Sequence, residues 1–429
     1  MTLVPKPAPS KLTAVRSLCW SAATGFARPA PPGFFPLDEE LALLPGNLTP
    51  RLQEALVRLS TQQPSFAKAA RELTFFTGAT VHPDTARRRS EAAGAVLLAY
   101  QTAEAARILR EHPTPPPGPA TLVFSVDGAM VPIVGGQWKE VRTLAVGAVQ
   151  PPRDTPDGVV IETSEVSYFS RLTDSDSFAE LAVLELHRRG IETAQRVGAV
   201  VDGAEWCQTF IDYHYAEAVR ILDHPHAAEH ITLIGQATTA DGPLLSVAEC
   251  ARLRQDLKQK GPDGVLAELR ALLSAHPELE EATKALAYLE KRQAMMRYDE
   301  FRAEGWPLGS GMVESGNKLV VEERLKGSGM HWVEQNVNPM LALRNAWCNE
   351  RWEESWSIIE REVRREVMER RQERRALRQV APAPPPAAPA PAVTSTVAAR
   401  APVEPATKPP HPWKRAWSVR RQRELANAA

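Results

Sequence analysis

The sequence predicts an α/β protein whose core is a mixed sheet flanked by helices. Two observations lead to this fold class. Short runs rich in Val, Ile, Leu and Phe recur between residues 121 and 222, and segments with apolar residues at helical spacing lie between and after them. The chain has 429 residues, enough for two or three domains and one large buried core.

Composition and hydropathy argue against several classes of protein. No stretch has the roughly eighteen continuous apolar residues of a membrane span, and no signal peptide is recognisable, so we expect a soluble cytoplasmic protein. The cysteines are scattered without a CxxC pair, which argues against a disulfide framework. The formal net charge of −1 argues against a chain that is basic throughout. Arginines nevertheless gather in 364–378, so the composition does not exclude a local basic surface that binds nucleic acid.

Composition and periodicity divide the chain into seven segments. They are an irregular Pro/Ala-rich segment (1–35), a helical region that is a candidate for DNA binding (36–111), a Pro-rich linker (112–120), the first part of the sheet core (121–242), a helical insertion (243–304), the last part of the core with C-terminal helices (305–378), and a low-complexity basic tail (379–429).

The region 36–111 resembles a helix-turn-helix. Two short helices, a break near Gly78 and a further helix with three consecutive arginines near its start give this pattern, although a plain helical bundle would look the same. The candidate DNA-binding residues here are Arg87, Arg88 and Arg89.

Within 121–242 we expect three strands first, and then helices alternating with strands. The expected strands are 121–126, 141–149, 159–170, 196–201 and 218–222. The expected helices are 178–190, one from about residue 204 and one from about residue 226.

Two of these strands end in Val-Asp-Gly, at Asp127 and Asp202. A buried strand seldom carries an acid unless that acid is paired or binds a metal, although Asp-Gly is also a common turn. Glu314 follows a Gly/Ser-rich loop at the start of a helix, where a solvated first-turn acid is the alternative. Three carboxylates from separate elements can converge on hard divalent cations such as Mg²⁺. The alternative carboxylates for this site are Asp174, Asp176, Asp212, Glu322 and Glu323.

Three long motifs surround these acids. They are SVDGAMVP with VGGQWKEVRTLAVGAV, then VVDGAEWCQTFIDYHYAEAVRILDHPHAAEH, and finally WPLGSGMVESGNK followed by RLKGSGMHW. Together, over roughly 120–350, they resemble the ISKra-type insertion-sequence transposases, relatives of the Mutator-like group.

The resemblance implies an RNase H-like core and a metal-dependent transposase of the bacterial nucleoid. The implied Asp-Asp-Glu triad is Asp127, Asp202 and Glu314, which would hold two Mg²⁺ or Mn²⁺ ions. Asp223 and His226 match the supporting Asp/Cys-x-x-His feature of the group. The implied partners are double-stranded DNA, as terminal inverted repeats and as target, and further copies of the chain in a homo-oligomer that pairs two DNA ends.

The N-terminal segment departs from the family. FFPLDEEL resembles the family sequence, but the paired zinc-ribbon cysteines that often precede it are reduced to Cys19. Either a metal site has been lost or the segment is not native to the family. An inactive DNA-binding relic is therefore an alternative function.

The stretch HAAEH suggests a rival function. It matches the H-x-x-E-H pattern of inverted zinc proteases, with His226 and His230 as ligands and Glu229 as base, but no third ligand is evident. A structural histidine near a helix start, with Asp223 as N-cap, explains His226 equally well.

Aromatic and basic residues near Glu314 are further candidates for DNA binding. Trp306 and Trp332 could stack on unpaired bases, although core packing is the commoner role of tryptophan. Phosphates could be contacted by Lys318, Arg324 and Lys326, which could equally be surface charges without a role.

Overall fold

The computed structural model describes residues 48–155, 158–240 and 242–380. The expectations for 1–35 and for the tail beyond residue 380 lie outside these residues. The chain forms two compact units, 1–372 and 373–429. Of the second unit, only the last turns of the long helix α15 (Trp352–Val380) are described.

The main sheet is mixed, as predicted. Its five strands, counted over the described residues, follow the order β5-β2-β1-β6-β7. They are β1 (Thr121–Ile133), β2 (Gln137–Val149), β5 (Thr163–Arg171), β6 (Arg196–Val201) and β7 (Val219–Leu222). β1, β2 and β5 are antiparallel neighbours, whereas β6 and β7 run parallel to β1. Small hairpins are formed by β3 (Arg153–Thr155) with β4 (Gly158–Val160), and by β8 (Thr238–Thr239) with β9 (Gly242–Pro243).

Strand β1 is twice as long as predicted. It continues through Asp127 and Gly128 to Ile133 and pairs with β2 along this whole length. The turn lies later, at Gly135 and Gly136, which both have positive φ. The strand persists because Ala129, Val131 and Ile133 keep the period-two alternation and bury themselves in the core.

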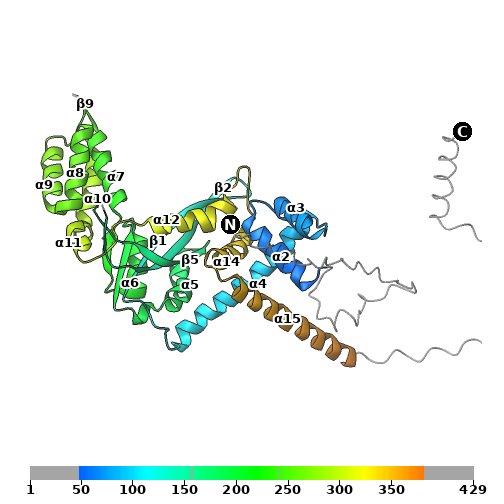
Figure 1. The fold of residues 1–429 in the computed structure, drawn as a ribbon. Helices are drawn as coiled ribbons and strands as arrows, with labels where there is room; N and C mark the ends of the chain where they lie inside the picture. The colour runs from blue at the N-terminus through cyan, green and yellow to red at the C-terminus, as the bar shows by residue number, and fades with distance from the viewer. Residues whose placement is uncertain (1–47, 156–157, 241, 381–429) are drawn as a thin grey trace, which may run out of the picture. The chain divides into compact units, whose positions relative to one another are not determined.

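Helices cover both faces of the sheet (Figure 1). Even-numbered residues of β1, such as Phe124, pack with α5 (Ser175–Arg188) and α6 (Glu205–Tyr215) in one core cluster. Odd-numbered residues face the other way: Val123 packs in the cluster of the helical insertion, and Val131 packs with α14 (Val337–Cys348).

The insertion follows β7 and has its own apolar core, which continues onto the sheet at Val200. Its helices, green to yellow-green in Figure 1, are α8 (Val247–Lys260), α9 (Pro262–Ser274), α10 (Glu280–Lys291) and α11 (Tyr298–Ala303). The preceding helix α7 (His224–Gln236) packs against α8 and α10.

The N-terminal helices are α2 (Pro50–Gln62), α3 (Phe66–Thr77) and α4 (Pro83–Glu111). Thr49 and Ser65 cap the first two, and Gly78 ends α3 in the left-handed conformation. α4 packs against both α14 and α5, so these helices lie on the sheet domain and do not form a detached module.

A continuous helical stretch follows the insertion. It consists of α12 (Gly311–Gly316), a π-helical segment (Asn317–Glu322) and α13 (Glu323–Leu325). Arg344 of α14 donates hydrogen bonds to carbonyl groups within the π segment, those of Leu319 and Val320. Such widened turns often mark functional sites. None of the helices in the described part of the chain is long and apolar enough to cross a membrane.

Candidate active site

Asp127 and Asp202 occupy matching positions on two adjacent parallel strands. In the ladder between β1 and β6, each residue pairs with the one 75 positions later, as Thr121 does with Arg196. Asp127 and Asp202 are also 75 positions apart. β6 ends at Val201, so the aspartates lie where its ladder with β1 has stopped. Alternation from Val123 and Val200, which share one core cluster, places both side chains on the same face of the sheet.

Asp223 extends this row to the next strand. Paired residues of β6 and β7 differ by 21, as do Asp202 and Asp223. Asp223 is only 5% exposed, and its carboxylate is already satisfied. It accepts hydrogen bonds from the backbone N–H of His226 at 3.1 Å, as the N-cap of α7, and from that of Ser310 at 2.7 Å. Asp223 therefore anchors the loop that leads to Glu314.

Glu314 lies on α12, which packs across β1, β2 and β5 (Figure 1). The close approach depends on Gly316, where an added Cβ would lie 2.7 Å from the ring of Tyr168. One turn after the exposed Glu314, the side-chain amide of Asn317 donates a hydrogen bond to Oδ2 of Asp127 at 2.9 Å. The helix thus brings the third acid to the strand that carries the first.

The carboxylates act on one another electrostatically. Burial is the main cause that raises the pKa of Asp127 above its ordinary value, and the negative charges of Asp202, Glu314 and Glu140 raise it further. A hydrogen bond from the N–H of Gly128 acts in the opposite direction. The site is therefore a half-buried concentration of negative charge.

Asp202 is held by groups from two helices. Its Oδ1 accepts hydrogen bonds from the N–H of Ala204 at 2.9 Å and from the thiol of Cys207 at 3.3 Å. Burial, reinforced by the charge of Asp202, raises the pKa of Cys207, so this cysteine stays a thiol and a donor. From α10, the hydroxyl of Tyr288 donates to the backbone carbonyl of Asp202.

Arg292 completes this support. Its guanidinium lies 3.7 Å from the ring centre of Tyr288 and donates to the carbonyl of Gly203 at 2.8 and 2.6 Å. Neither Tyr288 nor Arg292 was among the residues expected at the site. The only local signal was their i, i+4 spacing, which places an aromatic ring and a cation on one helix face.

The HAAEH histidines lie beside this support. Their rings are 5.1 Å apart, and His230 stacks on Tyr288 at 4.1 Å. Glu229 is largely exposed, 3.8 Å from Nδ1 of His226. Over the described residues, no three His, Cys, Asp or Glu side chains are arranged as they stand to hold a metal ion, either here or around Asp127.

Three of the expected DNA contacts are core residues instead. Trp306 and Trp332 are 1% and 5% exposed, so neither ring offers a face for a base. Arg324 is 1% exposed, lies between the rings of Phe66 and Trp332, and donates to the carbonyl of Ser60. Two aromatic rings and the Ser60 carbonyl replace part of the water around the guanidinium, whose Nη2 has no hydrogen-bond partner among the described residues.

The other expected DNA contacts are on the surface. Lys318 is exposed, one turn after Glu314, and Lys326 pairs with Glu322. Arg87 pairs with Asp84 and Glu91, and Arg88 also pairs with Asp84. Several of the alternative acids already have protein partners. Asp174 caps α5, Asp212 forms an ion pair with Arg220, and Glu323 forms one with Arg344.

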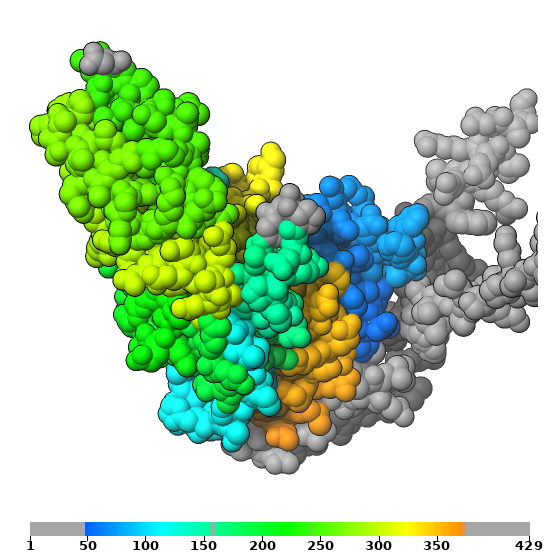
Figure 2. All heavy atoms as spheres, turned by 60° about the vertical axis from the view of Figure 1, so that its left-hand side comes forward, coloured from blue at the N-terminus to red at the C-terminus, as the bar shows by residue number. Residues whose placement is uncertain are grey.

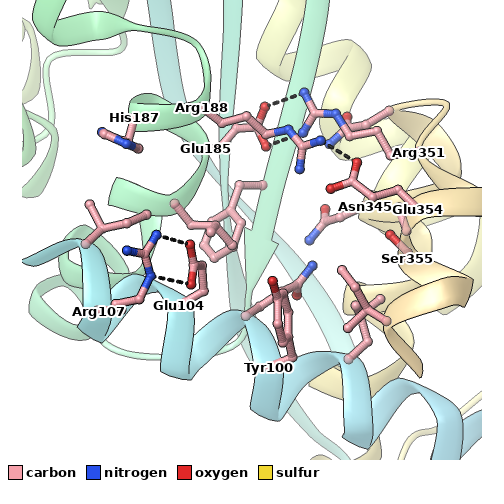
Figure 3. Close-up of a pocket in the computed structure, with 18 of the residues that line it drawn as sticks. Tyr100, Glu104, Arg107, Glu185, His187, Arg188, Asn345, Arg351, Glu354 and Ser355 are labelled. Atoms are coloured by element: carbon pink, nitrogen blue, oxygen red, sulfur yellow. Dashed lines mark hydrogen bonds and ion pairs between the residues drawn. The ribbon is translucent and has the colours of Figure 1, made fainter. Parts of the chain in front are cut away.

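A separate cavity of about 440 Å³ lies among α4, α5, β5, α14 and the start of α15 (Figure 3). Its charged groups are matched in pairs: Glu104 with Arg107, Glu185 with Arg351, and Arg188 with Glu354. None of the three candidate acids lines it. We interpret these pairs as packing between helices.

The candidate catalytic residues are thus Asp127, Asp202 and Glu314, with Asn317, Asp223, Tyr288 and Arg292 as their supports. In comparisons with known proteins, no family model matches the chain and no curated sequence matches it significantly.

Proposed function

We propose that the protein is a DNA transposase of the Asp-Asp-Glu type, which cleaves strands at the ends of a mobile element and joins them to target DNA. One observation carries the proposal: Asp127 and Asp202 are in register on adjacent parallel strands, and the charge of Glu314 acts on Asp127. The strand order β5-β2-β1-β6-β7, with only β2 antiparallel to both of its neighbours, supports the RNase H-like core that the motifs imply.

The three acids are suited to divalent cations. Among the described residues, no lysine, arginine or histidine forms an ion pair with Asp127, Asp202 or Glu314. Carboxylate oxygens are the ligands that Mg²⁺ and Mn²⁺ prefer. Two such ions, when bound, would activate the attacking oxygen and stabilise the leaving oxygen of a phosphodiester.

The chain's own groups hold the acids in place for this role. Asn317 orients the carboxylate of Asp127 through Oδ2, and Cys207 orients that of Asp202 through Oδ1. Asp223 fixes the loop before α12 through Ser310. These contacts restrain the two aspartates, but the three acids must still move closer together to share an ion, because no three of the described side chains are arranged to hold a metal as they stand.

The direct test uses labelled duplexes that carry the sequences flanking the gene. With Mg²⁺ or Mn²⁺ we expect nicking at the element ends followed by strand transfer, and a complex that contains more than one copy of the chain. Asp127→Ala should reduce cleavage by at least 100-fold and leave DNA binding intact. Asp212→Ala, which removes an acid paired with Arg220, is the matched control and should cleave normally.

The outcomes separate the alternatives. Cleavage by Asp127→Ala at the wild-type rate would refute the assignment of the site. DNA binding without nicking by the wild-type chain would favour the inactive relic. Hydrolysis of casein with Zn²⁺ would favour the protease that HAAEH suggests.

A further inference from the structure

A cavity of about 500 Å³ adjoins the loop that leads into the Glu314 helix. Its walls come from β1, from β4 and the start of β5, from α8 and α11, and from residues 306–309, 311 and 312. In Figure 2 the hairpin (teal) lies beside the end of the insertion (yellow-green).

Two cations line this cavity, and no acid does. Lys258 projects from α8 and Arg302 from α11. Neither forms an ion pair or side-chain hydrogen bond with any residue that the structure describes. This differs from the 440 Å³ cavity, where Arg107, Arg188 and Arg351 each have a carboxylate partner. The positive charge of the 500 Å³ cavity is therefore available to an anion.

The rest of the lining is mostly apolar. Val159, Ile161, Leu308 and Met312 present aliphatic surface. Thr163 is the only uncharged polar side chain in the lining, apart from the indole of Trp306, whose N–H is engaged by Glu304. Such a lining can contact a sugar or the face of a base, but it lacks the donors and acceptors that would distinguish one base from another.

The cavity is close to the candidate catalytic acid. Gly311, in its lining, is three residues before Glu314 on α12, a rise of about 4.5 Å along the helix axis. An added Cβ at Gly311 would meet no atom within 4 Å, so the helix start is open on this side.

We propose that this cavity binds one unpaired nucleotide of the substrate DNA strand, with its phosphate between Lys258 and Arg302. The volume of about 500 Å³ is large enough for a single nucleotide. The two cations complement a phosphodiester, and the aliphatic walls contact the base without reading its identity. The inference rests on the proposed function for the identity of the ligand as DNA, and it adds a sequence-independent subsite beside the cleavage position.

The test measures DNA binding in Ca²⁺, which separates binding from cleavage. Fluorescence anisotropy compares a blunt duplex with a duplex carrying a 3′ single-stranded tail, across a series of KCl concentrations. For the double variant Lys258→Ala/Arg302→Ala we expect about tenfold weaker binding of the tailed duplex. The slope of log K against log [KCl] should become shallower by about 1 to 2.

The control removes the same charge from the same insertion. Arg270→Ala/Lys284→Ala deletes two cations that are paired with Glu290 and Glu281, and it should bind the tailed duplex with the wild-type slope. Lys258→Arg/Arg302→Lys should also keep that slope, because the charges are retained. An unchanged slope in the alanine double variant, or an equal loss in the control, would overturn the inference.

Failure of the subsite and failure of the proposed function give different results. A wild-type chain that nicks DNA while the alanine double variant binds like wild type would refute only the subsite. A chain that shows the predicted slopes but never nicks DNA in Mg²⁺ would refute only the catalytic proposal.

Discussion

Asn317 donates a hydrogen bond from its side-chain amide to Oδ2 of Asp127 at 2.9 Å and thereby joins the helix of Glu314 to strand β1. The amide is nearly fully buried, and its own Oδ1 has no protein partner among the described residues. It is therefore a link between two of the three acids, made by a residue that carries no charge.

Loss of this link should weaken cleavage without unfolding the protein. For Asn317→Ala we expect a 10- to 100-fold lower cleavage rate and a higher Mg²⁺ concentration for half-maximal activity, because Asp127 loses its orienting donor. Asn336→Ala, which removes an amide bonded to Glu91, is the control. A normal Mg²⁺ requirement in Asn317→Ala would mean that the hydrogen bond has no part in catalysis.

The hydroxyl of Tyr288 gives a second prediction. Tyr288→Phe removes the donor to the carbonyl of Asp202 and keeps the ring that stacks on His230. We expect about 1 kcal/mol lower free energy of unfolding, measured with urea, together with a several-fold slower cleavage. Tyr213→Phe, on an exposed part of α6, should change neither quantity. Wild-type cleavage by Tyr288→Phe would show that the insertion does not support Asp202.

The partly buried His214 predicts how stability depends on pH. Burial lowers the pKa of His214 to about 4 from its ordinary 6.5, and the ring packs 4.5 Å from that of Phe210. The unfolded chain therefore takes up a proton before the folded chain does. This group's contribution to stability is complete above pH 6.5 and is lost as the pH falls towards 4, by about 3 kcal/mol in all.

His214→Phe should remove this dependence. Thermal unfolding of the variant between pH 7 and pH 5 should show a smaller fall in Tm than that of the wild type. His276→Phe, which changes a surface histidine beside Glu278, is the control and should keep the wild-type fall. Equal falls in all three proteins would contradict the prediction.

Much of the fold could be predicted from local patterns. The expected strand 196–201 matches β6, and the expected helix 178–190 lies within two or three residues of α5. The predicted end of β1 at residue 126 was wrong because Asp127-Gly128 has the composition of a turn. The backbone stays extended there because it pairs with β2, and this pairing cannot be recognised from the local sequence. Nothing local shows that the helix after Glu314 contains a π segment.

The candidate site could be predicted only in part. The three acids stood out because two repeat the Val-Asp-Gly pattern and one follows a glycine-rich loop. Asp223 was expected as a support from the family motif, but Tyr288 and Asn317 were not, because Tyr288 reaches Asp202 across 86 residues and Asn317 reaches Asp127 across 190. Arg324 was misassigned for the same reason: Phe66, which covers its guanidinium, lies far away in the sequence.

The insertion between the second and third acids is not a removable module. Its last long helix, α10, returns to the sheet with Tyr288 and precedes Arg292, and these two residues hold the backbone of Asp202 and Gly203. A shortened chain with a simple linker in place of residues 247–303 would keep all three acids. It would lose the hydrogen bonds that Tyr288 and Arg292 donate to the backbone of Asp202 and Gly203. The insertion is therefore part of the candidate site, because it fixes the backbone that carries the second acid.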